Sequence, residues 1–208
     1  MPTLRQLLAA HAPVLLIDAA SSRVQVGLLA ADGTGDWATS TEEAGVGVFQ
    51  CLEQLEVYPG DVGAFIFCDG PGSVLGTRTV AMALRTWSML TPRPMFAYHS
   101  LAVVAHALGR PGVQIIADAR RDAWHCLTVG ETLRRVPTAA LSGELMMPEG
   151  FRHWTPLPAG VTLTPYSLAA LLPQIMDEDL FRATEAPDAF LHEEPSYVTW
   201  TPQIHRAP

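Results

Sequence analysis

The sequence predicts an α/β fold, and three observations support this prediction. Short apolar runs rich in β-branched and aromatic residues recur along the 208-residue chain and alternate with segments of helical spacing. One such run, 62–68, leads through the glycine-rich turn 69–73 into a helical segment. An apolar run that ends in aspartate, followed by a polar turn and a returning strand, occurs twice, at Asp18 and at Asp118. Either an internal duplication or chance similarity would produce this repetition.

The first third of the chain predicts a short helix, three strands and a second helix. Leucines within 4–8 indicate one or two helical turns, closed by Pro13, before an apolar strand at 14–18. Residues 24–28 alternate apolar and polar, as in a half-exposed hairpin strand, and 37–39 can form a third strand. We expect the second helix from about 41 to 55, because Ser40 or Thr41 can cap it and glutamates follow.

The glycine-rich turn 69–73 lies between a strand expected to be buried on both faces, 62–68, and a helix expected over 78–90. Glycines allow a sharp bend and a close approach of the backbone to another group. The start of a helix also offers unpaired N–H groups to an anion. The turn therefore predicts either a phosphate-binding loop or a tight connection whose glycines only relieve steric crowding.

The second half of the chain predicts another series of strands and helices. A strand at 95–98 precedes a helix from Ser100 to about Leu108, and strands follow at 113–118 and 123–129. Beyond Gly130 we expect a loop-rich region, in which prolines are frequent after residue 136, with a short helix at 165–176 and an extended segment at 194–198.

Composition limits the classes of function. The net charge of −8 argues against a surface that coats nucleic acid unaided, because phosphate contacts need clustered basic side chains. Three cysteines in no CxxC spacing are typical of buried thiols in a reducing compartment. The first thirteen residues do not resemble a signal peptide, and no apolar run approaches the length of a membrane span. We therefore expect a cytoplasmic protein without membrane contact.

Asp18, Asp69 and Asp118 each close an apolar strand, and the carboxyl ends of strands line the ligand crevice of α/β folds. They could hold hydrated Mg²⁺ and the phosphates of ATP or ADP, or they could cap turns by accepting backbone N–H bonds. The candidates for a phosphate or nucleotide site are Asp18, Ser21, Gly70, Gly72, Ser73, Gly76 and Asp118.

Several features argue against catalysis and against a metal site. The chain has no lysine, which phosphate sites usually contain, and the histidines form no HxxxH pair. Ser73 does not lie in a GxSxG motif. His99 and His106 have no carboxylate or cysteine close by in the sequence to complete a ligand set. We predict no catalytic residue and no metal ligand.

Four stretches in order are identified as those of the TsaB (YeaZ) family: 16–18 (LID), 70–78 (GPGSVLGTR), 117–124 (ADARRDAW) and 194–198 (EPSYV). The resemblance runs from about 14 to 129 and returns at the tail. It implies an actin-like ATPase (ribonuclease H-like) fold of two lobes, each with a mixed β-sheet. The N-terminal lobe would span 1–98, with 1–12 as an extension and the tail 195–208 packed back on it. The smaller, loop-rich C-terminal lobe would span 99–194.

The family resemblance also implies a role. TsaB-type proteins are non-catalytic subunits that pair with a TsaD-type paralogue, which carries the HxxxH metal helix and modifies tRNA to threonylcarbamoyladenosine. A TsaE-type ATPase joins the assembly, and this chain would contact tRNA only indirectly. Two stretches depart from the family pattern, 18–21 and 72–76, and both departures remove hydroxyls that could face a phosphate.

Three hypotheses follow. In the first, the helices at 43–55 and 78–90 dock against the equivalent pair of a TsaD-type partner or of a second copy. The seam would be formed by Val48, Leu52, Val80, Leu84 and Trp87. In the second, the chain is an ATP-using small kinase or ATPase with Asp18 and Asp118 on Mg²⁺. The third is a glycoprotease-like (peptidase M22-like) activity, for which the sequence offers no metal or nucleophile site.

Overall fold

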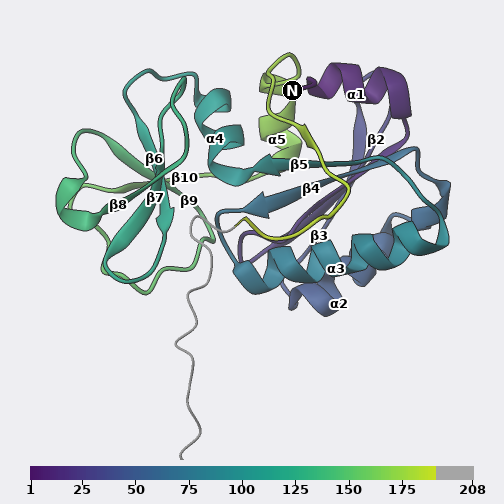
Figure 1. Ribbon diagram of the computed structural model, residues 1–208, viewed down its shortest axis with the longest axis horizontal. Coiled ribbons are helices and arrows are strands. Elements are labelled where there is room, and N and C mark those ends of the chain that lie inside the picture. Colours follow the sequence, from purple (N-terminus) through teal and green to yellow (C-terminus); the bar gives the residue numbers. More distant parts are fainter. Residues whose placement is uncertain (191–208) are drawn as a thin grey trace, which may run out of the picture.

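The computed structural model describes residues 1–190. It shows two lobes, each built around one β-sheet (Figure 1). The six-stranded sheet of the first lobe has the order β11-β5-β4-β1-β2-β3. Its elements are α1 (Leu4–His11), β1 (Val14–Asp18), β2 (Val24–Leu29), β3 (Gly35–Ser40), α2 (Ala44–Gln54), the 3₁₀ turn η1 (Pro59–Asp61), β4 (Ala64–Gly70), α3 (Val74–Leu90), β5 (Met95–His99) and β11 (Arg182–Ala183).

The second lobe contains a five-stranded sheet of order β10-β9-β6-β7-β8. Its elements, with the helices between the two sheets, are α4 (Ser100–Leu108), β6 (Gln114–Asp118), β7 (Ala123–Leu127), β8 (Arg134–Pro137), η2 (Thr138–Ala140), β9 (Leu145–Pro148), β10 (Thr162–Thr164), α5 (Leu168–Leu171) and η3 (Leu172–Gln174).

Both sheets are mixed, which confirms the predicted α/β fold of two lobes. In the first lobe β1 pairs antiparallel with β2 and parallel with β4, and β4 pairs parallel with β5. In the second lobe β6 pairs antiparallel with β7 and parallel with β9. The two aspartate-ended strands β1 and β6 therefore both form a hairpin with the next strand and a parallel pair on the other side.

Alternation along the central strands divides the apolar side chains between two layers. From β1, Leu15 and Ile17 pack beneath α2 and α3. Val14 and Leu16 face the opposite side, where one continuous core extends from α1 through α4 into the second sheet. Figure 1 shows α2 and α3 together along one side of the first sheet, with α1, α4 and α5 on the other. The two lobes are thus joined by a shared core.

The N-terminal extension is part of the first lobe. Thr3 and Gln6 form a capping box at the start of α1. Three leucines of α1 are buried in the core shared by the lobes, and Arg5 forms an exposed ion pair with Asp177 at 2.7 Å. The leucine pattern in 4–8 therefore reflects packing onto the sheet.

Several boundaries differ from those expected. Helix α3 begins at Val74 rather than near Arg78, because Ser73 provides the N-cap directly after the glycine turn. The helix expected at 165–176 is limited to α5 and η3. Strands β8, β9 and β10 lie in the region expected to be rich in loops. The sequence did not predict them because they are short and carry no clear alternation of apolar and polar residues.

The chain returns to the first lobe earlier than expected. Strand β11 pairs with β5, and the N–H of Phe190 donates to the carbonyl of Asp69 at 2.6 Å. The expected lobe boundary at residue 98 falls one residue before the end of β5 at His99 and stays a prediction. The predicted extended segment 194–198 and the tail 195–208 lie outside the described residues.

Within residues 1–190, none of the helices combines the length and the apolar character that crossing a bilayer would require.

Candidate functional site

The glycine-rich turn after β4 packs directly against the turn after β1. The N–H of Ser73 donates to the carbonyl of Ala20 at 2.7 Å. A Cβ atom at Gly72 would overlap the carbonyl oxygen of Ala20, and one at Gly76 would overlap that of Ala19. Gly72 also has a φ of 150°, which favours glycine. The steric explanation of these glycines therefore has direct structural support.

Ser73 and Ser21 make local hydrogen bonds in the two turns. The hydroxyl of Ser73 accepts the N–H of Gly76 at 3.2 Å and so caps α3. The hydroxyl of Ser21 donates to the carbonyl of Arg23 at 2.9 Å and accepts its N–H at 3.1 Å. Both hydroxyls stabilise the turns in which they occur.

Asp18 lies inside the protein rather than in an open crevice, which corrects its prediction as a phosphate or Mg²⁺ ligand. Its side chain is fully buried. Oδ2 accepts the hydroxyls of Tyr98 and Tyr166, both at 2.6 Å, and Oδ1 accepts the N–H of Ala20 at 2.9 Å. Tyr166 comes from the second half of the chain, so packing between the lobes closes this site.

Burial raises the pKa values of the three ionisable groups in this network, Asp18, Tyr98 and Tyr166. Desolvation raises the pKa of Asp18, while the hydrogen bonds from Tyr166, Tyr98 and Ala20 act in the opposite direction. Burial, followed by the adjacent Asp18 charge, raises the pKa of both tyrosines well above 10.0. Both phenols therefore keep their protons and act as donors to the carboxyl group.

Asp118 holds two segments of the second lobe together. Its Oδ1 accepts the N–H of Arg120 at 2.6 Å and the hydroxyl of Thr155 at 3.1 Å. Its Oδ2 accepts the N–H groups of Trp154 and Thr155. Partial burial opposes ionisation, but the N–H donors, Trp154 first, lower the pKa of Asp118 below its ordinary value of 3.8. Each carboxylate oxygen of Asp18 and of Asp118 already accepts at least one hydrogen bond, so neither side chain offers Mg²⁺ an unoccupied oxygen.

Asp69 links distant parts of the chain. Its buried carboxylate lies 2.8 Å from Nδ1 of His99 and 2.6 Å from Nη2 of Arg182. Sequence spacing indicated no carboxylate near His99, because the two residues are brought together by the parallel pairing of β4 with β5. Asp69 itself lines the cleft described next.

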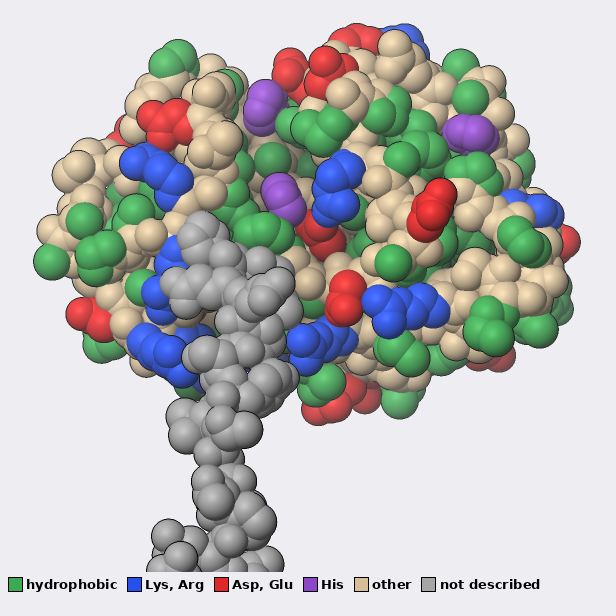
Figure 2. Space-filling view, viewed as in Figure 1, with side chains coloured by type: hydrophobic (Ala, Val, Ile, Leu, Met, Phe, Trp, Pro, Cys, Tyr) green, Lys and Arg blue, Asp and Glu red, His purple; other side chains and the backbone are tan. Residues whose placement is uncertain are grey.

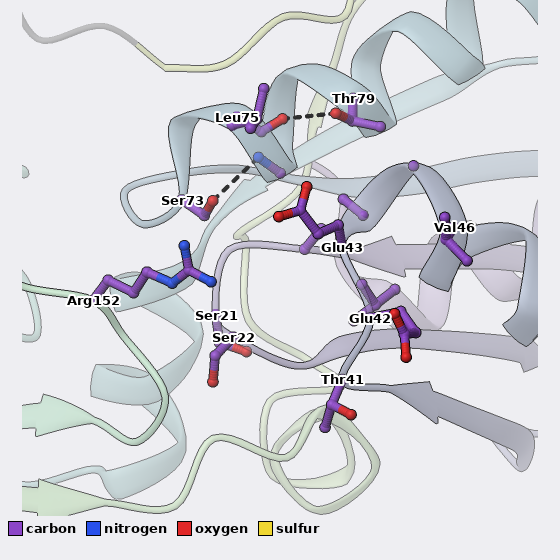
Figure 3. A pocket seen from close by; sticks show the side chains of 15 residues that line it. Ser21, Ser22, Thr41, Glu42, Glu43, Val46, Ser73, Leu75, Thr79 and Arg152 are labelled. Carbon is purple, nitrogen blue, oxygen red and sulfur yellow. Dashed lines mark hydrogen bonds between the residues drawn. The ribbon is translucent and has the colours of Figure 1, made fainter.

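Two cavities adjoin at the start of α3. The first, of about 350 Å³, lies between the N-termini of α2 and α3 and the turn after β1. Figure 3 shows Glu43 and Arg152 on opposite sides of this space, with Ser21 and Ser22 on the turn beneath. The second, of about 520 Å³, is a cleft between the glycine-rich turn and the second lobe. Arg152 lines both.

Six of the seven predicted phosphate-site residues line these cavities. Ser21, Ser73 and Gly76 border the first cavity, and Gly70, Gly72, Ser73 and Asp118 border the second. Asp18 borders neither. The structure adds three side chains that the sequence analysis did not single out as site residues, Arg78, Arg152 and Trp154. The last two lie in the loop after β9, where no periodic pattern indicated a site.

The predicted seam between α2, α3 and a partner needs correction. Val48, Leu52, Val80 and Leu84 are buried in the core beneath the two helices. Only Trp87 is partly exposed; its ring packs against Phe65 and, edge to face, against Phe49. The sheet had to be covered by one apolar face of each helix, and these four residues form that face.

The outward face of α2 and α3 carries other apolar side chains. We call Val46, Phe49, Leu75, Met82 and Met89 the outer apolar face; their exposed fractions are 52%, 55%, 72%, 57% and 86%. A groove of about 700 Å³ lined by Phe49, Trp87 and Tyr58 continues this face at one end. Among residues 1–190 no group of three or more His, Cys, Asp or Glu is placed to hold a metal ion.

Comparison with known proteins supports the fold alone. No family model matches the chain, and no curated protein matches it. The solved structure of YeaZ from Pseudomonas aeruginosa is similar, with a TM-score of 0.56 and 19% identity, covering 77% of this chain and 89% of that chain. A solved uncharacterized protein with similarity to peptidase YEAZ, from the same organism, has a TM-score of 0.55 and 19% identity, covering 77% and 88% of the two chains.

Proposed function

We propose that this chain is a non-catalytic subunit of TsaB (YeaZ) type. In this role it pairs with a TsaD-type threonylcarbamoyltransferase in the cytoplasm, and the pair, with a TsaE-type ATPase, modifies tRNA to N6-threonylcarbamoyladenosine. The fold shared with YeaZ and the family motifs support the assignment. The pairing surface is the outer apolar face of α2 and α3.

The observation that carries this proposal is the arrangement of exposed apolar side chains on these helices. Leu75, Met82 and Met89 are seven residues apart along α3, so they form one stripe on its outer side. Val46 and Phe49 are three apart on the neighbouring helix α2 and share a face. Contiguous exposed apolar patches mark interaction surfaces.

The hydrogen bonds that occupy Asp18 and Asp118 favour a subunit over an ATP-using enzyme. A kinase or ATPase that places Mg²⁺ on Asp18 would require this carboxyl group to leave Tyr98 and Tyr166, which hold it at 2.6 Å. Asp118 would have to release the N–H groups of the loop at 154–155. A glycoprotease-like activity has no supporting arrangement among the residues described above.

The proposal is tested by light scattering after gel filtration, with the 22.5 kDa chain alone and mixed with the TsaD-type protein of the same organism. A species of summed mass is expected for the mixture. Met82→Asp should abolish it, whereas Leu163→Asp, an exposed apolar position on β10, should not. Circular dichroism of both variants serves as the check that they fold.

Two results would overturn the proposal. One is a mixture in which the two proteins never associate while the chain alone forms a stable dimer, because the outer apolar face would then serve self-pairing. The other is an unchanged complex with Met82→Asp and with Phe49→Asp, since both charges would lie at the centre of the proposed contact.

A further inference from the structure

The cleft between the lobes gathers positive charge in an acidic protein. The chain has 21 acidic residues against 13 basic ones, all of them arginine. Yet Arg78 from the first lobe and Arg120 and Arg152 from the second line the same cleft of about 520 Å³. Figure 2 shows basic side chains on both sides of the region where the lobes meet. Three arginines against two aspartates give this lining an excess of basic side chains in a chain whose net charge is −8.

Two aspartates, Asp69 and Asp118, also line this cleft, and each is engaged with other groups. Asp69 is paired with Arg182, which does not line the cleft, and with His99. Asp118 accepts four hydrogen bonds from N–H and O–H groups. Asp188 approaches Arg78 only at 4.0 Å and is closer to Arg85, at 3.3 Å.

An aromatic ring accompanies the arginines. The guanidinium carbon of Arg120 lies 3.1 Å from the ring centroid of Trp154, a cation–π stack. Trp154 is 59% exposed although it lines the cleft. An exposed indole beside arginines is the combination with which proteins bind single-stranded nucleic acid: phosphates on the cations and bases on the rings.

We propose that this cleft binds a single-stranded segment of nucleic acid, with phosphates on Arg78 and Arg152 and a base at Trp154. A pocket for a free nucleotide would bury most of its ligand, but the side chain of Arg78 is 51% exposed. We therefore expect the ligand to be a nucleic-acid strand that crosses the cleft and extends beyond it. Leu75 at the start of α3 borders both this cleft and the outer apolar face, but the three arginines and Trp154 lie outside that face. The inference therefore does not depend on the pairing proposed above.

The test uses fluorescence anisotropy of the full chain with end-labelled twelve-residue oligouridine and oligothymidine, at 50 to 200 mM KCl. Each phosphate contact with a single strand contributes about −0.7 to the slope of log K against log salt. The two arginine contacts predict a slope of about −1.4, which is roughly a 7-fold loss of affinity over this range. Each of Arg78→Gln and Arg152→Gln should bring the slope about 0.7 closer to zero.

Two further variants separate the contributions. Arg110→Gln is the matched control, because Arg110 forms an exposed ion pair with Glu144 and does not line the cleft. Its slope should equal that of the unmodified chain. Trp154→Ala should weaken binding at least about five-fold without changing the slope, since it removes stacking but no charge. Trp154→Phe should restore part of the loss.

Binding to either oligonucleotide supports the inference, and the tighter of the two identifies the strand as RNA or DNA. The inference is overturned if the chain does not bind them, or if Arg110→Gln changes the slope as much as Arg152→Gln. It is also overturned if AMP or ATP competes as well as the strand at equal nucleotide concentration, because the cleft would then be a mononucleotide pocket. Met82→Asp should leave this binding intact, which keeps the test independent of pairing.

Discussion

Removing one hydroxyl from the buried network around Asp18 tests whether this network joins the two lobes. In Tyr166→Phe, Oδ2 of Asp18 keeps only the hydroxyl of Tyr98 at 2.6 Å. A hydrogen bond to a charged group contributes about 1.5–3 kcal/mol. We expect the free energy of unfolding to fall by about 2 kcal/mol, which corresponds to roughly 4–8 °C in Tm for a chain of this size.

Urea denaturation followed by tryptophan fluorescence measures this loss, with calorimetry for Tm. Tyr58→Phe is the matched control, because Tyr58 is 74% exposed. The control should stay within about 0.5 kcal/mol of the unmodified chain. A Tyr166→Phe variant as stable as the control would refute the reasoning. Tyr98→Phe should behave like Tyr166→Phe, and the double variant should lose less than the sum, because the two hydroxyls share one acceptor oxygen.

The same network predicts a pH dependence. Burial raises the pKa of Asp18 in the folded chain above the ordinary 3.8. The folded state therefore binds the proton more tightly, so the contribution of this group to stability is greatest below pH 3.8. It declines as the pH rises through the folded pKa. Tyr166→Phe removes a hydrogen bond that favours the carboxylate, so the decline should extend to higher pH. Urea midpoints measured across the acid range check the direction.

The remaining predictions concern the turn, the helices and the second lobe. Gly76→Ala should destabilise by more than 1 kcal/mol, because its Cβ would overlap the carbonyl of Ala19; an unchanged urea midpoint would contradict this. Leu84→Ala should lose about 2–5 kcal/mol and Met82→Ala less than about 0.5, since only Leu84 is buried; equal losses would contradict the assignment of helix faces. The lowered pKa of Asp118 contributes stability that is present above 3.8 and lost as the pH falls through the folded pKa. Asp118→Asn should therefore lower stability at pH 7 and flatten its acid dependence, and parallel pH profiles would refute this.

Much of the fold was predictable from the sequence because it depends on local patterns. Alternation in 24–28 predicted the hairpin strand β2, although packing buries most of the strand where half exposure was expected. The apolar run before Asp69 predicted the buried strand β4. The two aspartate-ended strands predicted the repeated arrangement around β1 and β6. Strands β8 to β10 were missed, since four residues or fewer give no period to detect.

The site depended on contacts between residues far apart in the chain. Helices α2 and α3 carry apolar residues on more than one side, so only packing on the sheet decided that Leu84 is buried and Met82 exposed. Sequence placed Asp18 at the end of a strand, but Tyr166, 148 positions away, decided that its carboxylate is enclosed. The arginine cleft exists only because the docked lobes bring Arg78 and Arg152 to the same space. Local periodicity determines strands and helices, whereas charge environment and burial follow from which distant surfaces pack together.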